Sequence, residues 1–308
     1  MGIRPFEAAD ADAAAELVRP LQPGILVTPG YLAHRERAEP ALARRRTWLA
    51  EEGGEVVGFA TSAVKWDERG VVGRLWIGVE PGRRSRGIGA ALYKLAEAHA
   101  REVGVQTLTV EVDDDPEGHR FVEARGFEPI SAEIVSVLDP NQTDLRELDG
   151  LEEAAGGAGF VPQTLHAMAG RQDEVAAFYE AAGAWGPGGE TNRITANDLW
   201  HFIFERPDLS WDGSYVVLDR QGRLVSLASL VVDLERGRAE NDWTATVPDL
   251  RGRRFALLVK LATIRWARAA GIREIVTAND DDNVPMLSLN RRLGYRRLYP
   301  QVELARAL

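Results

Sequence analysis

The chain has 308 residues, enough for two domains of about 150 residues that each bury a core. Its 45% hydrophobic content is typical of soluble globular proteins, and the absence of cysteine excludes disulfides, a thiol nucleophile and cysteine–zinc sites. A net charge of −10 argues against nonspecific nucleic-acid binding, and no apolar run is long enough for a membrane span or a signal peptide. We therefore expect a cytoplasmic protein with no bound metal and with neither nucleic acid nor membrane as a partner.

Hydrophobic periodicity in the first half of the sequence predicts alternating strands and helices. In chain order these are a strand at 3–6, helices at 10–18 and 31–38, strands at 46–51, 55–66 and 71–79, a long helix at 87–103, a strand at 107–112, a short helix at 117–124 and a strand at 127–138. Gly104 is placed to end the long helix.

The second half repeats this order after a connection at 141–159 that contains an Ala-Gly-Gly-Ala-Gly tract. The pattern predicts a strand at 163–169, helices at 172–182 and 196–205, a hairpin of strands 214–219 and 224–234, a strand at 239–247, a helix at 255–270, a strand at 274–278, a helix at 284–292 and a strand at 299–304.

Individual residues recur at a long period. Trp76, Pro81, Arg84 and Gly104 are each followed 167 residues later by the same residue type, at Trp243, Pro248, Arg251 and Gly271. Two copies of about 150 residues indicate a duplicated domain rather than a solenoid of short repeats. We predict an α/β protein of two units, at 1–140 and 160–308.

The most informative stretch joins a strand to the long helix through a basic, glycine-containing turn. It runs from Val79 to Leu92 and contains Arg84, Gly87 and Gly89. A helix that begins at glycines presents unpaired backbone N–H groups, which suits a pyrophosphate. The turn lacks the Gly-Lys-Ser/Thr of a P-loop and the third glycine and acidic residue of a dinucleotide fingerprint.

At these residues the chain resembles the GNAT superfamily of N-acetyltransferases. The superfamily signature V-x-P-x-x-[QR]-x-x-G-x-[GA] is met by Val79, Pro81, Arg84, Gly87 and Gly89, and its closing Gly-Phe by Gly126-Phe127. The second copy has the same signature with one departure, since Arg254 stands where the first glycine belongs. It closes with Gly294-Tyr295 after a motif that starts at Asn283.

The resemblance implies two tandem GNAT-like domains, each a mostly antiparallel twisted sheet flanked by helices. It also implies acetyl-CoA as co-substrate. The residues expected to bind it are Gly78, Val79, Arg84, Ser85, Arg86, Gly87, Ile88, Gly89 and Ala90 in the first copy and Thr246, Val247, Arg251, Gly252, Arg253, Arg254, Phe255, Ala256 and Asn283 in the second.

The superfamily transfers the acetyl group directly to an amine in a ternary complex. Its usual general acid is a tyrosine four residues before the closing glycine, a position held here by Val122 and Asn290. A carboxylate on the fourth strand can accept the proton of the amine, which makes Asp242 a candidate base and favours the second copy as the catalytic one. Glu240 is a second candidate, and Glu111 and Asp113 could bind an acceptor amine.

Aromatic residues of the second copy could form the wall of an acceptor pocket. They are Trp185, Trp200, His201, Phe204 and Trp211.

These observations predict an acetyl-CoA-dependent N-acetyltransferase of a small-molecule amine, active as a monomer or homodimer. Two alternatives stay open: acetylation of a protein or peptide N-terminus, and a CoA-binding module in which one or both copies are catalytically degenerate.

Overall fold

The computed structural model describes residues 1–67, 70–185 and 195–308, leaving aside the side chains of 66–67 and 182–185. Its first ten elements are β1 (Gly2–Pro5), α1 (Ala11–Val18), α2 (Pro29–Ala38), β2 (Arg46–Glu52), β3 (Glu55–Asp67), β4 (Gly70–Val79), α3 (Ile88–Glu102), β5 (Thr107–Val112), α4 (Pro116–Glu123) and β6 (Glu128–Leu138). Each lies within a few residues of its predicted position.

The remaining elements are α5 (Leu148–Gly157), β7 (Val161–Thr164), α6 (Gln172–Trp185), α7 (Ala196–Leu199), β8 (Tyr215–Leu218), β9 (Leu224–Asp233), β10 (Arg238–Thr246), α8 (Phe255–Ala269), β11 (Glu274–Asp280), α9 (Val284–Leu293) and β12 (Arg296–Ala307). Two local details differ from the prediction. A 3₁₀ helix at Leu165–Met168 cuts short the strand predicted to reach residue 169, and α7 continues as a π-helical turn at Trp200–Phe204.

Helix α5 lies inside the segment that we predicted as a plain connection. Its glycines have low helix propensity, but Leu148, Leu151 and Ala155 form one apolar face. These three residues belong to the same core cluster as Leu258 of α8. Tertiary packing therefore overrides the weak propensity of this segment.

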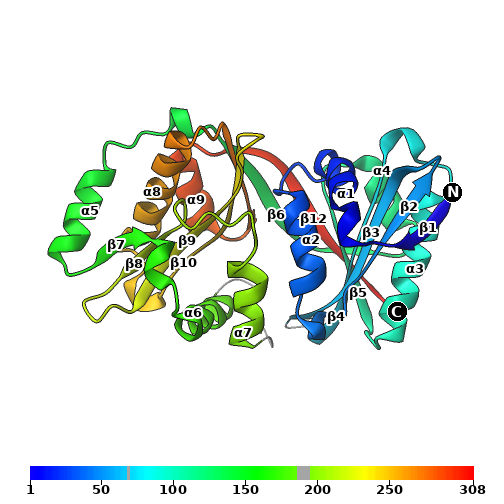
Figure 1. Cartoon of the computed structure of the whole chain (residues 1–308), viewed down its shortest axis with the longest axis horizontal. Coiled ribbons are helices and arrows are strands. Elements are labelled where there is room, and N and C mark those ends of the chain that lie inside the picture. Colours follow the sequence, from blue (N-terminus) through cyan, green and yellow to red (C-terminus); the bar gives the residue numbers. More distant parts are fainter. Residues whose placement is uncertain (68–69, 186–194) are drawn as a thin grey trace.

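All strands of the described residues form one mixed sheet, in the order β1-β2-β3-β4-β5-β12-β6-β11-β10-β9-β8-β7. The last strand of each copy lies beside the fifth strand of the other copy. β12 pairs with β5, with Val302 opposite Val112, and β6 pairs with β11, with Asp280 opposite Glu133. β6 and β12 also pair with each other and cross the middle of the molecule (Figure 1).

The exchange defines two structural halves. The first half contains β1 to β5 with β12, and the second contains β7 to β11 with β6. The domain boundaries predicted at 140 and 160 follow the repeat in the sequence, whereas strands on either side of these boundaries pair in one sheet.

Helices cover both faces of the sheet in each half (Figure 1). In the first half the adjacent residues Leu49 and Ala50 point to opposite faces, one into the core under α1 and the other into the core under α3. In the second half Leu227 packs with α6 and α7, and Ala228 packs with α8. The sheet is therefore buried on both sides where helices cover it.

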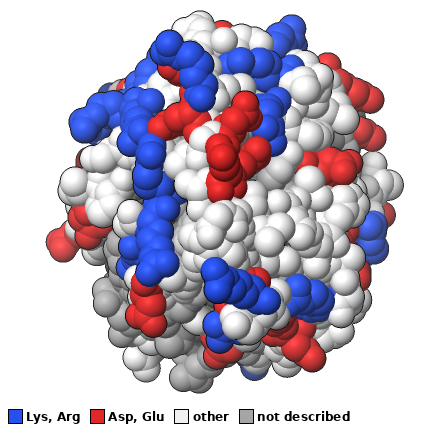
Figure 2. Space-filling model, turned by 90° about the vertical axis from the view of Figure 1, so that its left-hand side faces the viewer, with Lys and Arg blue, Asp and Glu red and all other residues white. Residues whose placement is uncertain are grey.

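The end of the molecule that carries α5 mixes basic and acidic side chains (Figure 2). Several of them are paired, as are Arg265 with Glu152 at 2.8 Å and Arg254 with Glu147. The net negative charge is therefore not concentrated on this face.

Replacing Leu304 of β12 by alanine tests the placement of that strand in the first half. Leu304 is fully buried in one core cluster with Leu75 and Leu108. Its truncation should lower the free energy of unfolding by about 2–5 kcal/mol, measured by urea denaturation. Leu298→Ala on the same strand, where the residue is 38% exposed, should cost far less. Equal losses for the two variants would contradict the exchange.

Candidate functional site

A cleft opens in the first half where β4 and β5 diverge. The two strands pair in parallel from Val72–Thr107 to Leu75–Val110, and no pairing follows beyond Leu75. A cavity of about 510 Å³ fills the opening and extends between α3 and α4. It places the end of β4, the basic turn and the start of α3 around one space.

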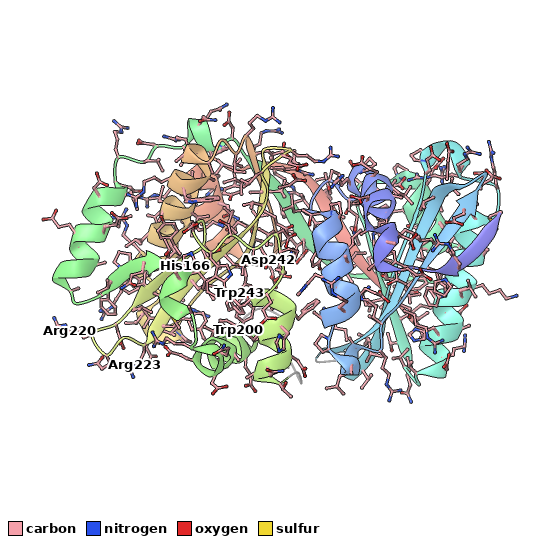
Figure 3. The ribbon with its side chains drawn as sticks, viewed as in Figure 1. His166, Trp200, Arg220, Arg223, Asp242 and Trp243 are labelled. Atoms are coloured by element: carbon pink, nitrogen blue, oxygen red, sulfur yellow. The ribbon has the colours of Figure 1, made fainter. Side chains whose placement is uncertain are left out.

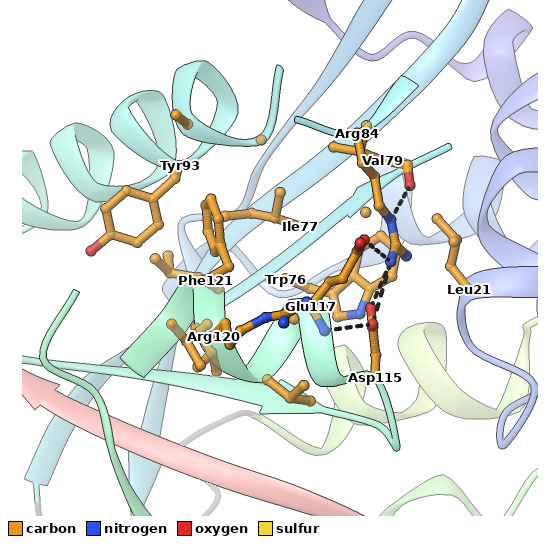
Figure 4. Close-up of a pocket in the computed structure, with 18 of the residues that line it drawn as sticks. Leu21, Trp76, Ile77, Val79, Arg84, Tyr93, Asp115, Glu117, Arg120 and Phe121 are labelled. Carbon is orange, nitrogen blue, oxygen red and sulfur yellow. Dashed lines mark hydrogen bonds and ion pairs between the residues drawn. The ribbon is translucent and has the colours of Figure 1, made fainter. Parts of the chain in front are cut away.

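The signature turn forms one wall of this cleft (Figure 4). Gly87 has φ of +85°, a left-handed conformation that glycine adopts without strain, and α3 begins at the next residue. Gly87, Gly89 and Ala90 all line the cleft. The N–H groups in the first turn of a helix have no partner within it, so this wall suits the phosphates of a CoA ester.

Arg84 lies across the mouth of the cleft. Its guanidinium forms ion pairs with Asp115 at 3.0 Å and Glu117 at 3.1 Å, and its Nε donates to the Val79 carbonyl at 3.3 Å (Figure 4). An entering phosphate would compete with these two carboxylates for the guanidinium. Arg84 is therefore held beside the cleft by two partly exposed carboxylates, which an anion could displace.

A second cavity of about 560 Å³ lies between the two halves; we call it the central cavity. It shares Leu75, Trp76 and Glu111 with the cleft of the first half. From the second copy it is lined by Phe202, Arg206, Glu240, Asp242 and Ala278. Because β10 and β11 stop pairing at Glu240 and Val276, the central cavity adjoins the point where the strands diverge in both copies.

The arginines that line the central cavity are paired with carboxylates. Arg74 bonds Glu111 at 2.5 Å, and Arg206 bonds Asp208 at 2.7 Å and lies 3.8 Å from Asp242. Burial pushes the pKa of Glu111 upward, but the Arg74 guanidinium outweighs it and holds that pKa below its usual range.

Four other carboxyl groups of the cavity have raised pKa values. Burial, with Glu39 nearby, raises the pKa of Glu36 against the opposing effect of Arg45. Burial, together with Glu111 and Asp280, raises the pKa of Glu133 to about 7. Burial and the neighbouring Asp242 raise the pKa of Glu240. Burial also raises the pKa of Asp242, against the opposing effect of Arg206.

The signature turn of the second copy keeps the backbone of the first and changes its side chains. Arg254 has φ of +67°, so it adopts the left-handed conformation of Gly87 despite its side chain. Its guanidinium pairs with Glu147, which also accepts from Arg292. Arg253 and Arg254 border a cavity of about 410 Å³ between α5 and α8.

Most of the residues expected to bind acetyl-CoA in the first copy line its cleft. They are Gly78, Val79, Arg84, Ser85, Gly87, Gly89 and Ala90. Two others point elsewhere: Ile88 is buried in the core at 2% exposure, and Arg86 is exposed, 4.0 Å from Glu52.

In the second copy the expected residues are more dispersed. The Thr246 hydroxyl bonds Ser226 at 2.8 Å, and Arg251 donates to the Thr246 carbonyl at 3.4 Å. Phe255 packs in the core with its ring centroid 4.7 Å from that of Phe160. Asn283 caps α9, Gly252 has φ of +79°, and Val247 and Ala256 are half-buried.

The two candidate catalytic residues have different surroundings. Asp242 lies on β10 near the middle of the molecule and faces the central cavity (Figure 3). Asn290 is 2% exposed and donates to Asn279 Oδ1 at 2.6 Å, while its own Oδ1 has no partner in the described part of the chain. Val122, at the position of the usual acid in the first copy, is buried beside the cleft.

Most of the aromatic residues proposed to line an acceptor pocket lie in or against a hydrophobic core cluster. Trp200 and Phe204 are 8% and 2% exposed and stack with centroids 5.0 Å apart, and Trp211 packs against them. His201 pairs with Glu205 on the surface. The side chain of Trp185 lies outside the described residues. Phe202 faces the cavity instead.

Sequence reasoning missed Glu133 and Arg206. Glu133 is a charged residue in the largely apolar segment 128–138, which is a weak signal. In the ranges 1–67, 70–185 and 195–308, no helix is long and apolar enough to cross a membrane. Within the same ranges no three His, Asp or Glu residues are grouped as ligands of a metal ion.

Gly89→Glu tests the phosphate-binding wall. A Cβ at Gly89 would lie 3.5 Å from the Phe121 ring, an ordinary contact, so the variant should fold. Its carboxylate would enter the cleft and repel the phosphates, lowering the affinity for acetyl-CoA at least tenfold, or about 1.4 kcal/mol. Calorimetry measures the affinity. It is done on the full chain, because the last strand of the first copy, β6, pairs with β11 of the second copy.

Gly82→Glu is the matched control for that variant. Gly82 lies in the same turn, has open space around it and does not line the cleft. The control should change the affinity by less than about threefold, as expected for a screened surface charge. A folded Gly89→Glu protein with unchanged affinity would refute the assignment.

Comparison with known proteins indicates the same family as the signature turn. The model of the Acetyltransferase (GNAT) family matches residues 14–127 and 175–295. A mycothiol acetyltransferase of Clavibacter michiganensis subsp. michiganensis is 30% identical over 234 residues, covering 74% of this chain and 71% of that protein. The mycothiol acetyltransferase of Pseudarthrobacter chlorophenolicus is 25% identical over 280 residues, covering 88% and 78%.

Solved structures share the whole fold. A tandem GNAT protein from the clavulanic acid biosynthesis pathway superposes with a TM-score of 0.77 at 23% identity, covering 99% of this chain and 98% of that one. A GCN5-related N-acetyltransferase from Sphaerobacter thermophilus superposes with a TM-score of 0.66 at 19% identity, covering 99% and 95%. With two family matches, a shared tandem architecture and a signature turn that lines a cleft, the chain belongs to the GNAT acetyltransferase family and is an N-acetyltransferase.

Proposed function

We propose that the first copy binds acetyl-CoA and that the acetyl group passes directly to the amine of a small molecule held in the central cavity. The observation that carries this proposal is the shared wall of the two cavities at Leu75, Trp76 and Glu111. A thioester in the cleft and an amine in the central cavity would meet at that wall, as direct transfer requires.

The end of β4 suits the developing oxyanion. Beyond Leu75 the edge of β4 that faces β5 has no strand partner, so backbone N–H groups on that edge are free to donate. Gly78 lies in this stretch, and a Cβ there would meet the Trp76 ring at 2.4 Å. The packing of Trp76 against the backbone therefore requires glycine at this point.

Glu133 is the proposed base. A carboxyl group with a pKa of about 7 can accept the proton of an ammonium, directly or through one water, and is about half ionised at neutral pH. Glu111 lies nearer the cleft, but its ion pair with Arg74 and its lowered pKa make it a weaker base.

A small-molecule acceptor fits the central cavity better than a protein N-terminus does. The volume of about 560 Å³ is within the range of small-molecule sites, and the walls come from both halves. Two relatives carry the name mycothiol acetyltransferase, which supports a small acceptor. A CoA-binding module without turnover is the competing interpretation, and acetyl-CoA consumption with and without a panel of small amines separates the two.

The second copy remains a candidate for the catalytic one, with Asp242 as its base. The central cavity adjoins its diverging strands as well, and Asp242 is 29% exposed there with a raised pKa. Comparison of variants of the two carboxylates identifies the working copy.

Glu133→Gln should lower kcat at neutral pH by about 10²- to 10⁴-fold, because it removes the general base. The wild-type rate should rise as pH passes about 7, where Glu133 ionises, and this inflection should be absent from the variant. The loss should shrink at high pH, where the amine deprotonates without help. Rate measurements on the best amine of the panel, across pH 5.5 to about 10, test this.

Glu128→Gln, an exposed carboxylate of the same strand, is the control and should retain the wild-type profile. If Asp242→Asn shows the pH-dependent loss and Glu133→Gln does not, the second copy is catalytic and the proposal for the first is wrong.

A further inference from the structure

Each arginine that lines the central cavity has a carboxylate within bonding distance, although Arg35 and Arg45 share one. Lys65 is the other basic residue in the lining. The pairs are Arg35 and Arg45 with Glu39 at 2.7 and 2.6 Å, Arg74 with Glu111 at 2.5 Å, and Arg206 with Asp208 at 2.7 Å. A carboxylate on the acceptor would have to displace one of these partners.

Three carboxyl groups among the described residues of the cavity lack such a pair, namely Glu36, which lies on α2, and Glu133 and Glu240, which lie on the sheet. Among the described residues, neither Glu133 nor Glu240 forms an ion pair. Glu240 accepts one hydrogen bond, from the Leu26 N–H at 2.6 Å. Beside it, Asp242 and Asp208 share the single guanidinium of Arg206. This end of the cavity therefore has more carboxylates than cations.

Burial disfavours the ionised form and is the largest cause of the raised pKa values of Glu133 and Glu240. It outweighs the opposing effects of Arg74 and Lys65 on Glu133 and of Arg206 on Glu240. A further cation placed in contact with either carboxyl group would favour its ionised form.

The strand registers place the two groups on one face of the sheet. Glu133 is opposite Asp280, and Glu240 is opposite Val276, four residues away on the same strand. An even separation keeps side chains on one face, and the strand spacings give about 13 Å along the strands and about 10 Å across them. With two flexible glutamate side chains, a ligand of about 8–16 Å could touch both.

We propose that the acceptor carries a second positive charge and that Glu240 recognises it while the reacting amine lies near Glu133. The substrate class is a small diamine, polyamine or amino sugar with two ammonium groups. This inference rests on the proposed function, with the first copy as the donor site. Glu240 acts as a specificity-determining residue contributed by the second copy to the reaction of the first copy.

The first test compares acceptors of matched length. Linear α,ω-diamines of about five to twelve carbons, which bracket the expected separation, are each compared with the n-alkylamine and the ω-amino acid of the same length. The readout is kcat/KM with acetyl-CoA. At one or more lengths the diamine should exceed both matched compounds by at least about tenfold, as expected for a desolvated charge pair.

Glu240→Gln should reduce the ratio of diamine to alkylamine to about one, since the amide cannot pair with a cation. The substitution preserves the acceptor oxygen for the Leu26 N–H, so the link between the halves remains. Glu235→Gln, an exposed carboxylate just before β10 and outside the cavity, is the control and should keep the wild-type ratio.

The preference should also depend on pH. Glu240 must be ionised to hold a cation, and Asp242 and Asp208 oppose its ionisation, while Arg206 and the Leu26 N–H favour it. The ratio of diamine to alkylamine should therefore rise with pH until the second amine of the diamine itself deprotonates. The reacting amine must lose its proton in both compounds, so the ratio removes this pH dependence from the comparison.

Two outcomes overturn the inference while leaving the proposed function intact. In the first, the alkylamine or the amino acid has the same kcat/KM as the diamine at every length. In the second, Glu240→Gln keeps the wild-type preference for the diamine. If acetyl-CoA binds and no amine is acetylated, the proposed function fails instead. In that case thermal shift of the full chain still decides. A diamine that raises Tm more than its matched compounds do, with the difference lost in Glu240→Gln, supports the inference, and no difference overturns it.

Discussion

The exchange of β6 and β12 is the constraint on which the rest of the molecule depends. Each of these strands pairs with a strand of the other copy, and the two pair with each other through the middle of the sheet. The halves consequently share main-chain hydrogen bonds, and β6 and β12 contribute Glu133 and Gln301 to the lining of the central cavity. Without these exchanged strands, no cavity would contain carboxyl groups from both copies.

Duplication kept the backbone of the signature turn and changed its chemistry. Gly87 and Arg254 both adopt the left-handed conformation before the long helix, although only glycine does so without cost. In the first copy the turn opens into a cleft, whereas in the second Arg254 is tied to Glu147 of the connecting segment. The same strand–turn–helix unit thus lines a cleft in one copy and forms an ion pair with the start of α5 in the other.

The central cavity combines strong charges with limited access to water. Its arginines are each paired with a carboxylate, and other carboxyl groups of the described lining have no ion pair. Burial raises the pKa of Glu133 towards neutrality and that of Glu240 as well, and the two groups come from different copies of the repeat. Binding of a cation and acceptance of a proton therefore depend on the same desolvation.

The sequence by itself determined most of the secondary structure, the duplication and the signature turn, because helical and strand periodicity and the glycines of the turn are local features. It did not reveal which fifth strand each final strand would join, since the residues of β6 and β12 suit either neighbour and strand pairing is a long-range choice. It also missed α5, which is stabilised by packing on α8, and it assigned Trp200 and Phe204 to a pocket when they fill the core. The surroundings of Glu133 were decided only by the tertiary structure. Burial in the central cavity is the main cause of its raised pKa, and Asp280, which also raises it, lies on a strand of the other copy that the exchange places beside β6.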